Sequence, residues 1–133
     1  MPASTDRYRT AVARYFEAWN AREPEALARA IATAWAPQGS YTDPLADVRG
    51  LEGITAVIAA AHAQFPGFVF RLTGAVDGHH DTARFSWELV SEAGGASSGG
   101  GSAPVAGSDV ITLDPDGRIT SVLGFLDRAP AAV

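Results

Sequence analysis

The sequence predicts an α+β domain in which three N-terminal helices pack into a curved, mostly antiparallel sheet. Two observations lead to this prediction. Apolar residues recur at helical spacing through most of residues 5–65, and from Phe68 onward the apolar period changes from 3.6 to 2. Helices that precede a run of antiparallel strands are typical of α+β proteins. A curved sheet wrapped around helices is expected to leave a cone-shaped interior with a pocket.

Three helices are expected, over residues 5–22, from Pro24 to Trp35, and over residues 51–65. Proline suits the first position of the second helix, and a Pro-Gly pair should end the third. An aromatic stripe with helical spacing runs along the first helix, formed by Tyr8, Val12, Tyr15 and Trp19.

The strands are expected in two places. Residues 40–44 form a short extended segment between the second and third helices, followed by an irregular stretch over residues 45–50. A four-stranded meander follows, with Asp77-Gly78 as a two-residue hairpin turn. The predicted meander strands start near Phe68 and run over 83–89, 105–113 and 118–126; the Gly- and Ser-rich residues 93–104 are expected to be a flexible hairpin loop, and residues 128–133 a frayed tail.

Composition limits the classes of function. The chain has 133 residues, which suits a single domain over residues 1–133, and a net charge of −5 with scattered charges, which argues against a nucleic-acid partner. No apolar run approaches the ~18 residues needed to span a bilayer, so no membrane partner is expected. Without an export signal a cytoplasmic location is expected, and the lack of cysteine excludes disulfides and cysteine-based zinc sites.

Two aspartates are candidates for chemistry. Tyr41 and Asp43 project from the same face of a strand, so Asp43 either points into the interior as an acid or base, or opens a turn before Pro44. Asp109 shares its face with Ile111, so it is either a buried, protonated carboxyl or a rim residue paired with an arginine.

The histidines carry weaker signals. His79-His80 follows the predicted hairpin turn and is expected in solvent, whereas His62 either lines a cavity or is a satisfied residue at the edge of the core. No histidine pair has the i, i+4 spacing of a zinc site, and no G-x-S-x-G motif is present. No metal and no cofactor are therefore expected.

Over nearly its whole length the chain resembles the nuclear-transport-factor-2-like (NTF2-like, or cystatin-like) superfamily, in its SnoaL-like and ketosteroid-isomerase-like branch. The resemblance lies in residues 14–21 (RYFEAWNA), Tyr41-Thr42-Asp43-Pro44, residues 49–54 (RGLEGI), Gly107-Ser108-Asp109, residues 116–119 (DGRI) and Gly124-Phe125.

The resemblance implies roles for three residues. Asp43 matches the general base that moves a proton next to a carbonyl, Tyr15 matches the oxyanion-hole tyrosine, and Asp109 matches the protonated acid beside it. SnoaL-type polyketide cyclases rely on a pocket aspartate, for which Asp109 is again the choice. The residues expected to contact a ligand are Trp19, Trp35, Tyr41, Val57, Ala61, His62, Phe65, Phe85, Trp87 and Leu89.

Two functions follow from these expectations. The first is an isomerase or cyclase that uses Asp43 for proton transfer on a small, apolar, steroid- or polyketide-like carbonyl compound. The second is a non-catalytic ligand-binding or dimerisation module. An open cavity that both carboxylates face would favour the enzyme, whereas an aromatic plug with Asp43 paired to Arg49 would count against it. A homodimer through the outer sheet face, which carries Arg84 and Glu88, is expected by resemblance.

Overall fold

The computed structural model describes residues 2–91 and 105–129, so the predicted loop over residues 93–104 and the last residues of the predicted tail lie outside the described residues. The described residues form three helices and six strands. The helices are α1 (Pro2–Asn20), α2 (Pro24–Ala34) and α3 (Leu51–Gln64), and the strands are β1 (Trp35–Asp43), β2 (Ala46–Arg49), β3 (Phe68–His79), β4 (Thr82–Ser91), β5 (Val105–Leu113) and β6 (Ile119–Arg128).

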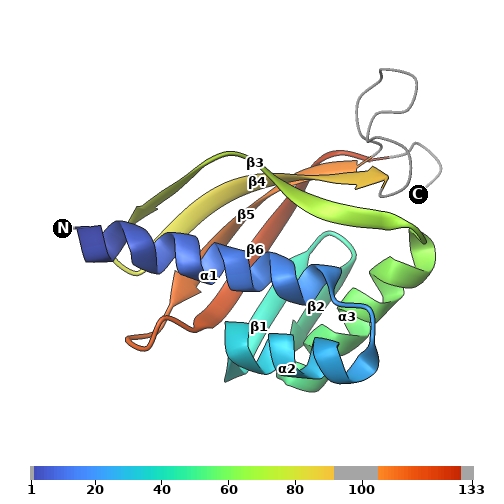
Figure 1. Ribbon diagram of the computed structural model, residues 1–133, viewed down its shortest axis with the longest axis horizontal. Helices are drawn as coiled ribbons and strands as arrows, with labels where there is room; N and C mark the ends of the chain where they lie inside the picture. The colour runs from blue at the N-terminus through green and yellow to red at the C-terminus, as the bar shows by residue number, and fades with distance from the viewer. Residues whose placement is uncertain (1, 92–104, 130–133) are drawn as a thin grey trace.

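The described strands form a single sheet in the order β2-β1-β6-β5-β4-β3. Neighbouring strands are antiparallel except for β1 and β6, which are parallel. Figure 1 shows α1 running across one face of this curved sheet, with α2 and α3 packed near β1 and β2. The predicted α+β class and the mostly antiparallel sheet are therefore confirmed.

The aromatic stripe of α1 faces the sheet and is buried. Tyr8, Val12, Tyr15 and Trp19 all belong to the core. The Tyr15 ring meets Phe85 of β4, and the Trp19 ring meets Phe70 of β3. At the end of α1, the side-chain amide of Asn20 donates to the carbonyl of Phe70 and accepts from its N–H, at 3.0 and 2.8 Å. These two bonds fix the end of the helix against β3.

The region between α2 and α3 differs from the sequence prediction. Trp35 was expected in the last turn of the second helix, but it begins β1, with φ −107° and ψ 146°. The cause is Pro37, which cannot continue a helix and holds Ala36 in an extended conformation. Residues 46–49, expected to be irregular, form β2 and pair with residues 40–43.

The predicted Asp77-Gly78 turn is also wrong. Strand β3 continues to His79, and the chain reverses at His80, which has a positive φ of 52°. Gly78 is instead a point of close approach, because a Cβ at this position would lie 2.5 Å from the Tyr8 ring. The absence of a side chain at Gly78 therefore allows Tyr8 of α1 to pack closely against β3, and this residue does not form a hairpin turn.

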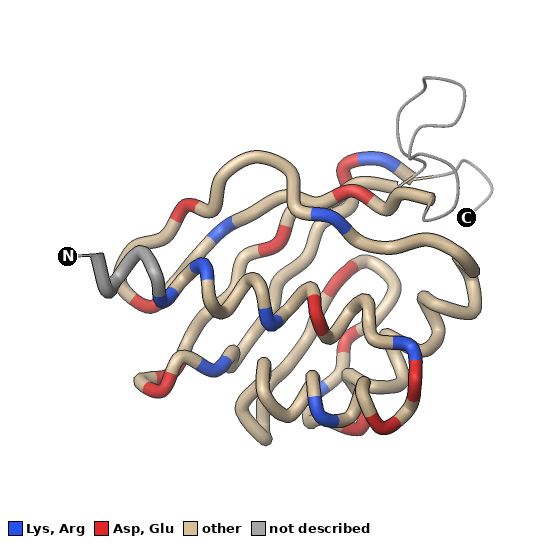
Figure 2. Tube along the Cα trace, viewed as in Figure 1, with Lys and Arg blue, Asp and Glu red and all other residues tan. Residues whose placement is uncertain are grey.

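Charges of both signs are spread over the helices and strands, as Figure 2 shows, without a basic block. In the described part of the chain, no helix is long and apolar enough to cross a membrane.

Candidate active-site cavity

A cavity of about 380 Å³ lies between the helices and the concave face of the sheet. This volume is at the lower end of the range for small-molecule sites, about 300–1,000 Å³. Mostly apolar and aromatic side chains line it, with few polar groups. The described lining residues are Tyr15, Phe16, Trp19, Tyr41, Asp43, Leu45, Ala46, Val48, Gly53, Ala56, Val57, Ala60, Ala61, Gln64, Phe65, Phe70, Trp87, Leu89, Val105, Leu126 and Ala129.

Four aromatic rings form a continuous wall of this cavity, which we call the aromatic wall: Tyr41, Trp19, Phe70 and Trp87. Successive ring centroids are 5.5, 4.8 and 5.3 Å apart, and successive planes are inclined by 53°, 57° and 66°. These tilted and edge-on contacts are favourable arrangements for aromatic pairs. The wall joins α1 to β1, β3 and β4, so tertiary packing brings together residues that are far apart in the sequence.

Asp43 lies at the end of β1, and its half-buried carboxylate borders the cavity. The Tyr41 hydroxyl donates to Oδ2 at 2.6 Å, and the backbone N–H of Leu45 donates to Oδ1 at 2.8 Å. The two alternatives for Asp43 are therefore compatible, since the same side chain closes a local turn and borders the interior. Arg49 does not pair with it; its guanidinium donates to the carbonyl of Gln38 at 3.3 Å.

Asp109 lies on the buried face of β5, as its alternation with Ile111 predicts, and is 2% exposed. The Tyr15 hydroxyl, equally buried, donates to its Oδ2 at 2.5 Å. Asp109 does not border the cavity, because it lies behind Tyr15, which does. An enzyme was expected to have both carboxylates facing the cavity. In the structure Asp43 faces the cavity, whereas Asp109 lies behind Tyr15.

Burial has the largest effect on Asp109 and raises the pKa of its carboxyl to about 6. Hydrogen bonds from Tyr15 and Trp87 oppose this rise, and the charges of Asp43 and Asp127 add to it. Burial, followed by the nearby charge of Asp109, raises the pKa of Tyr15 well above its usual value. Burial also raises the pKa of Tyr41, together with its hydrogen bond to Asp43. Both phenols therefore keep their protons near neutral pH.

Gly124 makes the packing of the two acids possible. It pairs with Asp109 across β5 and β6, while Leu123, its neighbour, pairs with Thr42 on β1. A Cβ at position 124 would lie 2.8 Å from Asp109 Oδ1 and 3.4 Å from the Cβ of Asp43. The absence of a side chain leaves room for the Asp109 carboxyl, with Asp43 on the other side.

The structure brings most of the residues predicted to contact a ligand to the cavity: Trp19, Tyr41, Val57, Ala61, Phe65, Trp87 and Leu89 border it. Trp35 and Phe85 do not, because they are buried in the core against the Tyr15 ring, at 5.5 and 5.2 Å between centroids. Sequence reasoning did not assign Phe16 or Phe70 to the site. The alternation of Phe68 and Phe70 on β3 was the available signal for Phe70.

His62 also lies outside the lining residues. Its Nε2–H donates to the carbonyl of Trp19 at 2.6 Å, since a carbonyl can only accept. His79 and His80 are exposed at the turn between β3 and β4. Within residues 2–91 and 105–129, no group of three or more histidine, aspartate or glutamate side chains could hold a metal ion.

A curved sheet with helices on its concave face and an aromatic cavity between them defines a small domain of the NTF2-like cone class. A family model for the SnoaL-like domain matches residues 12–122, so the chain belongs to the SnoaL-like family. No curated protein sequence matches the chain.

Solved structures agree with this assignment. A protein from Agrobacterium tumefaciens, provisionally described as an isomerase of the SnoaL-like family, is 39% identical with a TM-score of 0.80, over 92% of this chain and 98% of that one. A provisional SnoaL-like polyketide cyclase from Jannaschia sp. CCS1 is 20% identical with a TM-score of 0.70, over 92% and 87%. A provisional polyketide cyclase from Sinorhizobium meliloti is 22% identical with a TM-score of 0.64, over 86% and 93%.

Proposed function

We propose that this protein is an acid–base enzyme, an isomerase or cyclase, that transfers a proton on a small carbonyl compound bound in the cavity. The observation that carries the proposal is the position of Asp43. It is the only carboxylate among the described residues that line the cavity, and hydrogen bonds from Tyr41 and Leu45 hold both of its oxygens. A carboxylate fixed in an apolar site is suited to general base catalysis, which typically contributes about 10²–10⁴-fold.

In the proposed reaction, Asp43 removes a proton from the carbon next to the carbonyl group. The electron pair of the broken C–H bond moves toward the carbonyl oxygen and forms an enolate. Asp43 then returns the proton to a different carbon, so the product is an isomer of the substrate and the carboxylate is regenerated. In a cyclase, the enolate carbon would instead attack a second carbonyl carbon of the same substrate. The electron pair of that C=O π bond would move to its oxygen, which would take the proton from Asp43, so the carboxylate is again regenerated.

Tyr15 is the candidate donor to the enolate oxygen, because its ring borders the cavity. Its proton is held by Asp109 when that carboxyl is ionised. When Asp109 is protonated, its own O–H can donate to the Tyr15 oxygen, and the Tyr15 proton is free to donate to the ligand. The pKa of Asp109, raised to about 6 by burial, allows this exchange in mildly acidic solution.

The relatives support the reaction class. The Agrobacterium protein, at 39% identity, is provisionally an isomerase, and two structures with the same fold are provisionally polyketide cyclases. All three descriptions are compatible with chemistry next to a carbonyl group.

The decisive experiment compares Asp43→Asn with the wild-type protein. The assay follows conversion of a β,γ-unsaturated cyclic ketone to its conjugated isomer by ultraviolet absorbance. We expect Asp43→Asn to lose at least about 10²-fold in turnover because the base is removed. The matched control is Asp47→Asn, an exposed acid on β2 that does not line the cavity and should keep wild-type activity. Full activity in Asp43→Asn would contradict the proposal.

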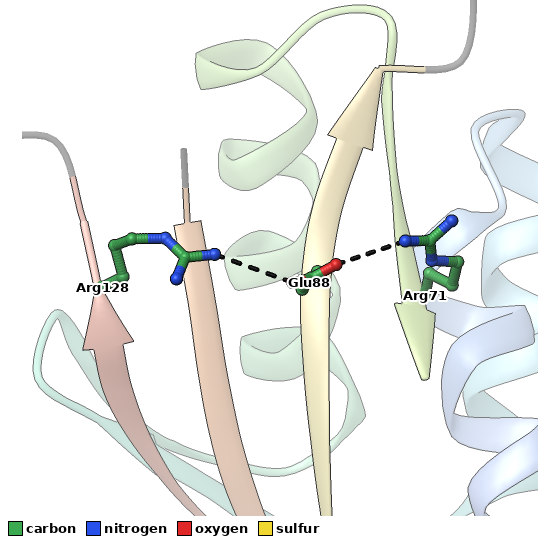
Figure 3. Close-up of polar contacts among 3 residues, drawn as sticks. All are labelled: Arg71, Glu88 and Arg128. Atoms are coloured by element: carbon green, nitrogen blue, oxygen red, sulfur yellow. Dashed lines mark hydrogen bonds and ion pairs between the residues drawn. The ribbon is translucent and has the colours of Figure 1, made fainter. Parts of the chain in front are cut away.

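We further propose that two copies associate through the outer face of the sheet. On β6 this face carries Leu123 and Phe125, which are 47% and 58% exposed. Beside them, Figure 3 shows Arg71, Glu88 and Arg128 in a row across β3, β4 and β6, with helix α3 behind the sheet. Glu88 pairs with the two arginines at 3.2 and 3.7 Å. An apolar centre with charged residues at its edge is typical of a protein interface.

A further inference from the structure

No positively charged side chain lies among the described residues that line the cavity. The chain has no lysine, and all its arginines and histidines lie in the described ranges. None of them lines the cavity. Asp43 contributes a carboxylate to the wall, and Asp109 lies directly behind Tyr15. The charged side chains at and directly behind the described wall are therefore acidic, which favours a positively charged ligand over an anion of the same shape.

The aromatic wall adds to this preference. The face of an aromatic ring is negative, and a cation within about 6 Å of a ring centroid is attracted to it, with tryptophan the most effective residue. The planes of Tyr41, Trp19, Phe70 and Trp87 are inclined to one another by 53°, 57° and 66°, so the rings are not stacked in parallel. Several inclined rings beside a carboxylate are the arrangement that recognises organic ammonium groups.

The wall and the carboxylate are joined directly. The Tyr41 hydroxyl donates to Asp43 Oδ2 at 2.6 Å, so the ring at one end of the wall touches the acid. Trp19, the next ring, lies 5.5 Å from the Tyr41 ring. An ammonium group against Trp19 and Tyr41 would therefore lie close to the Asp43 carboxylate as well.

We propose that the cavity binds a small organic cation, a compound whose ammonium nitrogen lies against the aromatic wall beside Asp43. This inference rests on the proposed function for its choice of cavity, and it names the substrate class: a carbonyl compound that also carries an ammonium group. Enolate formation moves the negative charge of Asp43 onto the substrate, and no arginine, lysine or histidine side chain lines the cavity to offset it. A cationic nitrogen within the substrate supplies that missing charge.

The test uses two ligands of the same shape that differ in charge: (4-hydroxyphenyl)trimethylammonium and 4-tert-butylphenol. Isothermal titration calorimetry at neutral pH measures the dissociation constant of each for the full chain. We expect the cation to bind at least tenfold more tightly, because burial of apolar area is nearly equal for the two and only the cation gains from the rings and the carboxylate. Equal affinity, tighter binding of the neutral compound, or no binding of the cation at millimolar concentration overturns the proposal.

Variants test whether the preference for the cation over the neutral ligand arises in the cavity. Phe70→Leu removes one ring from the wall, Asp43→Asn removes the charge, and each should reduce the ratio of the two affinities at least threefold. The matched controls are Phe125→Leu and Asp47→Asn, which change an exposed ring and an exposed acid outside the cavity and should leave the ratio unchanged. Circular dichroism of each variant verifies that it is folded. A ratio that is insensitive to both cavity variants also overturns the proposal.

The two proposals can fail separately. Cation preference is a binding measurement that needs no turnover, and turnover of the neutral ketone needs no cation. If the ketone is converted in an Asp43-dependent way and the cation preference is absent, the present inference is wrong and the acid–base enzyme remains. If the cation preference holds and no turnover depends on Asp43, the cavity is a binding site for organic cations and the proposed enzymatic function is wrong.

Discussion

Asp43 and Asp109 flank Gly124, since a Cβ at position 124 would lie 3.4 Å from the Cβ of Asp43 and 2.8 Å from Asp109 Oδ1. Asp43 lies on the cavity side, held by Tyr41, and Asp109 lies in the core, held by Tyr15. Each aspartate therefore has a tyrosine donor of its own. Because the two charges are close, ionisation of Asp43 raises the pKa of Asp109 further. Two acids with different surroundings in one site are a common basis for acid–base catalysis.

Gly124→Ala should destabilise the protein. A glycine-to-alanine change in a strand usually stabilises by roughly 0.5–1 kcal/mol. Here the new Cβ would lie 2.8 Å from Asp109 Oδ1, so overpacking should cost about 1–3 kcal/mol. Urea unfolding measures the free energy. The same change in an Asp109→Ser background, where the carboxyl is absent, should cost less, and equal costs in the two backgrounds would show that the carboxyl is not the cause.

The stability conferred by Asp109 should depend on pH. Its carboxyl has a pKa of about 6 in the folded protein, whereas an unfolded aspartate has about 3.9. The folded state therefore binds the Asp109 proton more tightly than the unfolded state does. The stability gained from this tighter proton binding is fully present below about pH 4 and is lost as pH rises through about 6. As pH rises from about 4 to above 6, the free energy of unfolding of Asp109→Asn should increase relative to that of wild type by up to about 3 kcal/mol, because asparagine does not ionise.

The measurement is a series of urea unfolding curves between pH 4 and pH 7 for both proteins. Asp116→Asn, in the exposed turn between β5 and β6, is the control, and its difference from wild type should not change with pH. A constant difference for Asp109→Asn across the series would contradict the raised pKa.

Turnover of the ketone should fall as pH rises through about 6. Ionised Asp109 keeps the Tyr15 proton, so Tyr15 cannot donate it to the enolate oxygen. The pH–rate profile of Asp109→Asn should lack this decrease, because an asparagine at that position does not ionise. If wild-type turnover instead rises steadily from pH 6 to pH 8, Tyr15 and Asp109 do not act together in this way.

Tyr41→Phe should lower kcat by at least about tenfold and change KM little. The variant keeps the ring in the aromatic wall but removes the hydrogen bond to Asp43 Oδ2, and a bond to a charged group contributes about 1.5–3 kcal/mol. Steady-state kinetics measure both constants. Tyr8→Phe loses a comparable bond, 2.7 Å long to the carbonyl of His80, away from the cavity and should keep wild-type kcat. Equal kinetics for the two variants would mean that Tyr41 does not position Asp43.

Phe125→Glu should convert the proposed dimer to a monomer, because it places a charge at the apolar centre of the outer sheet face. Light scattering after gel filtration measures the mass. The control is Leu72→Glu, an exposed apolar residue on β3 that shares the inner face with Phe70 and should leave the dimer intact. A wild-type protein that is monomeric at micromolar concentration would exclude this interface.

The sequence by itself determined the three helices, the later antiparallel strands, the α+β class and the family, because hydrophobic period, proline positions and short motifs are local properties. It did not predict β2, because residues 46–49 form a strand only by pairing with residues 40–43 of β1. It also placed Tyr41 and Asp43 on one face, since their spacing in a strand decides this. Tertiary structure decided which side chains reach the cavity. Asp109 and Asp43 belong to different strands, and only the pairing of β1, β6 and β5 places one behind Tyr15 and the other on the cavity wall. Packing between segments also places Trp35 and Phe85 in the core. It likewise brings Trp19 of α1 against Phe70 of β3 in the aromatic wall, and local periodicity does not specify either arrangement.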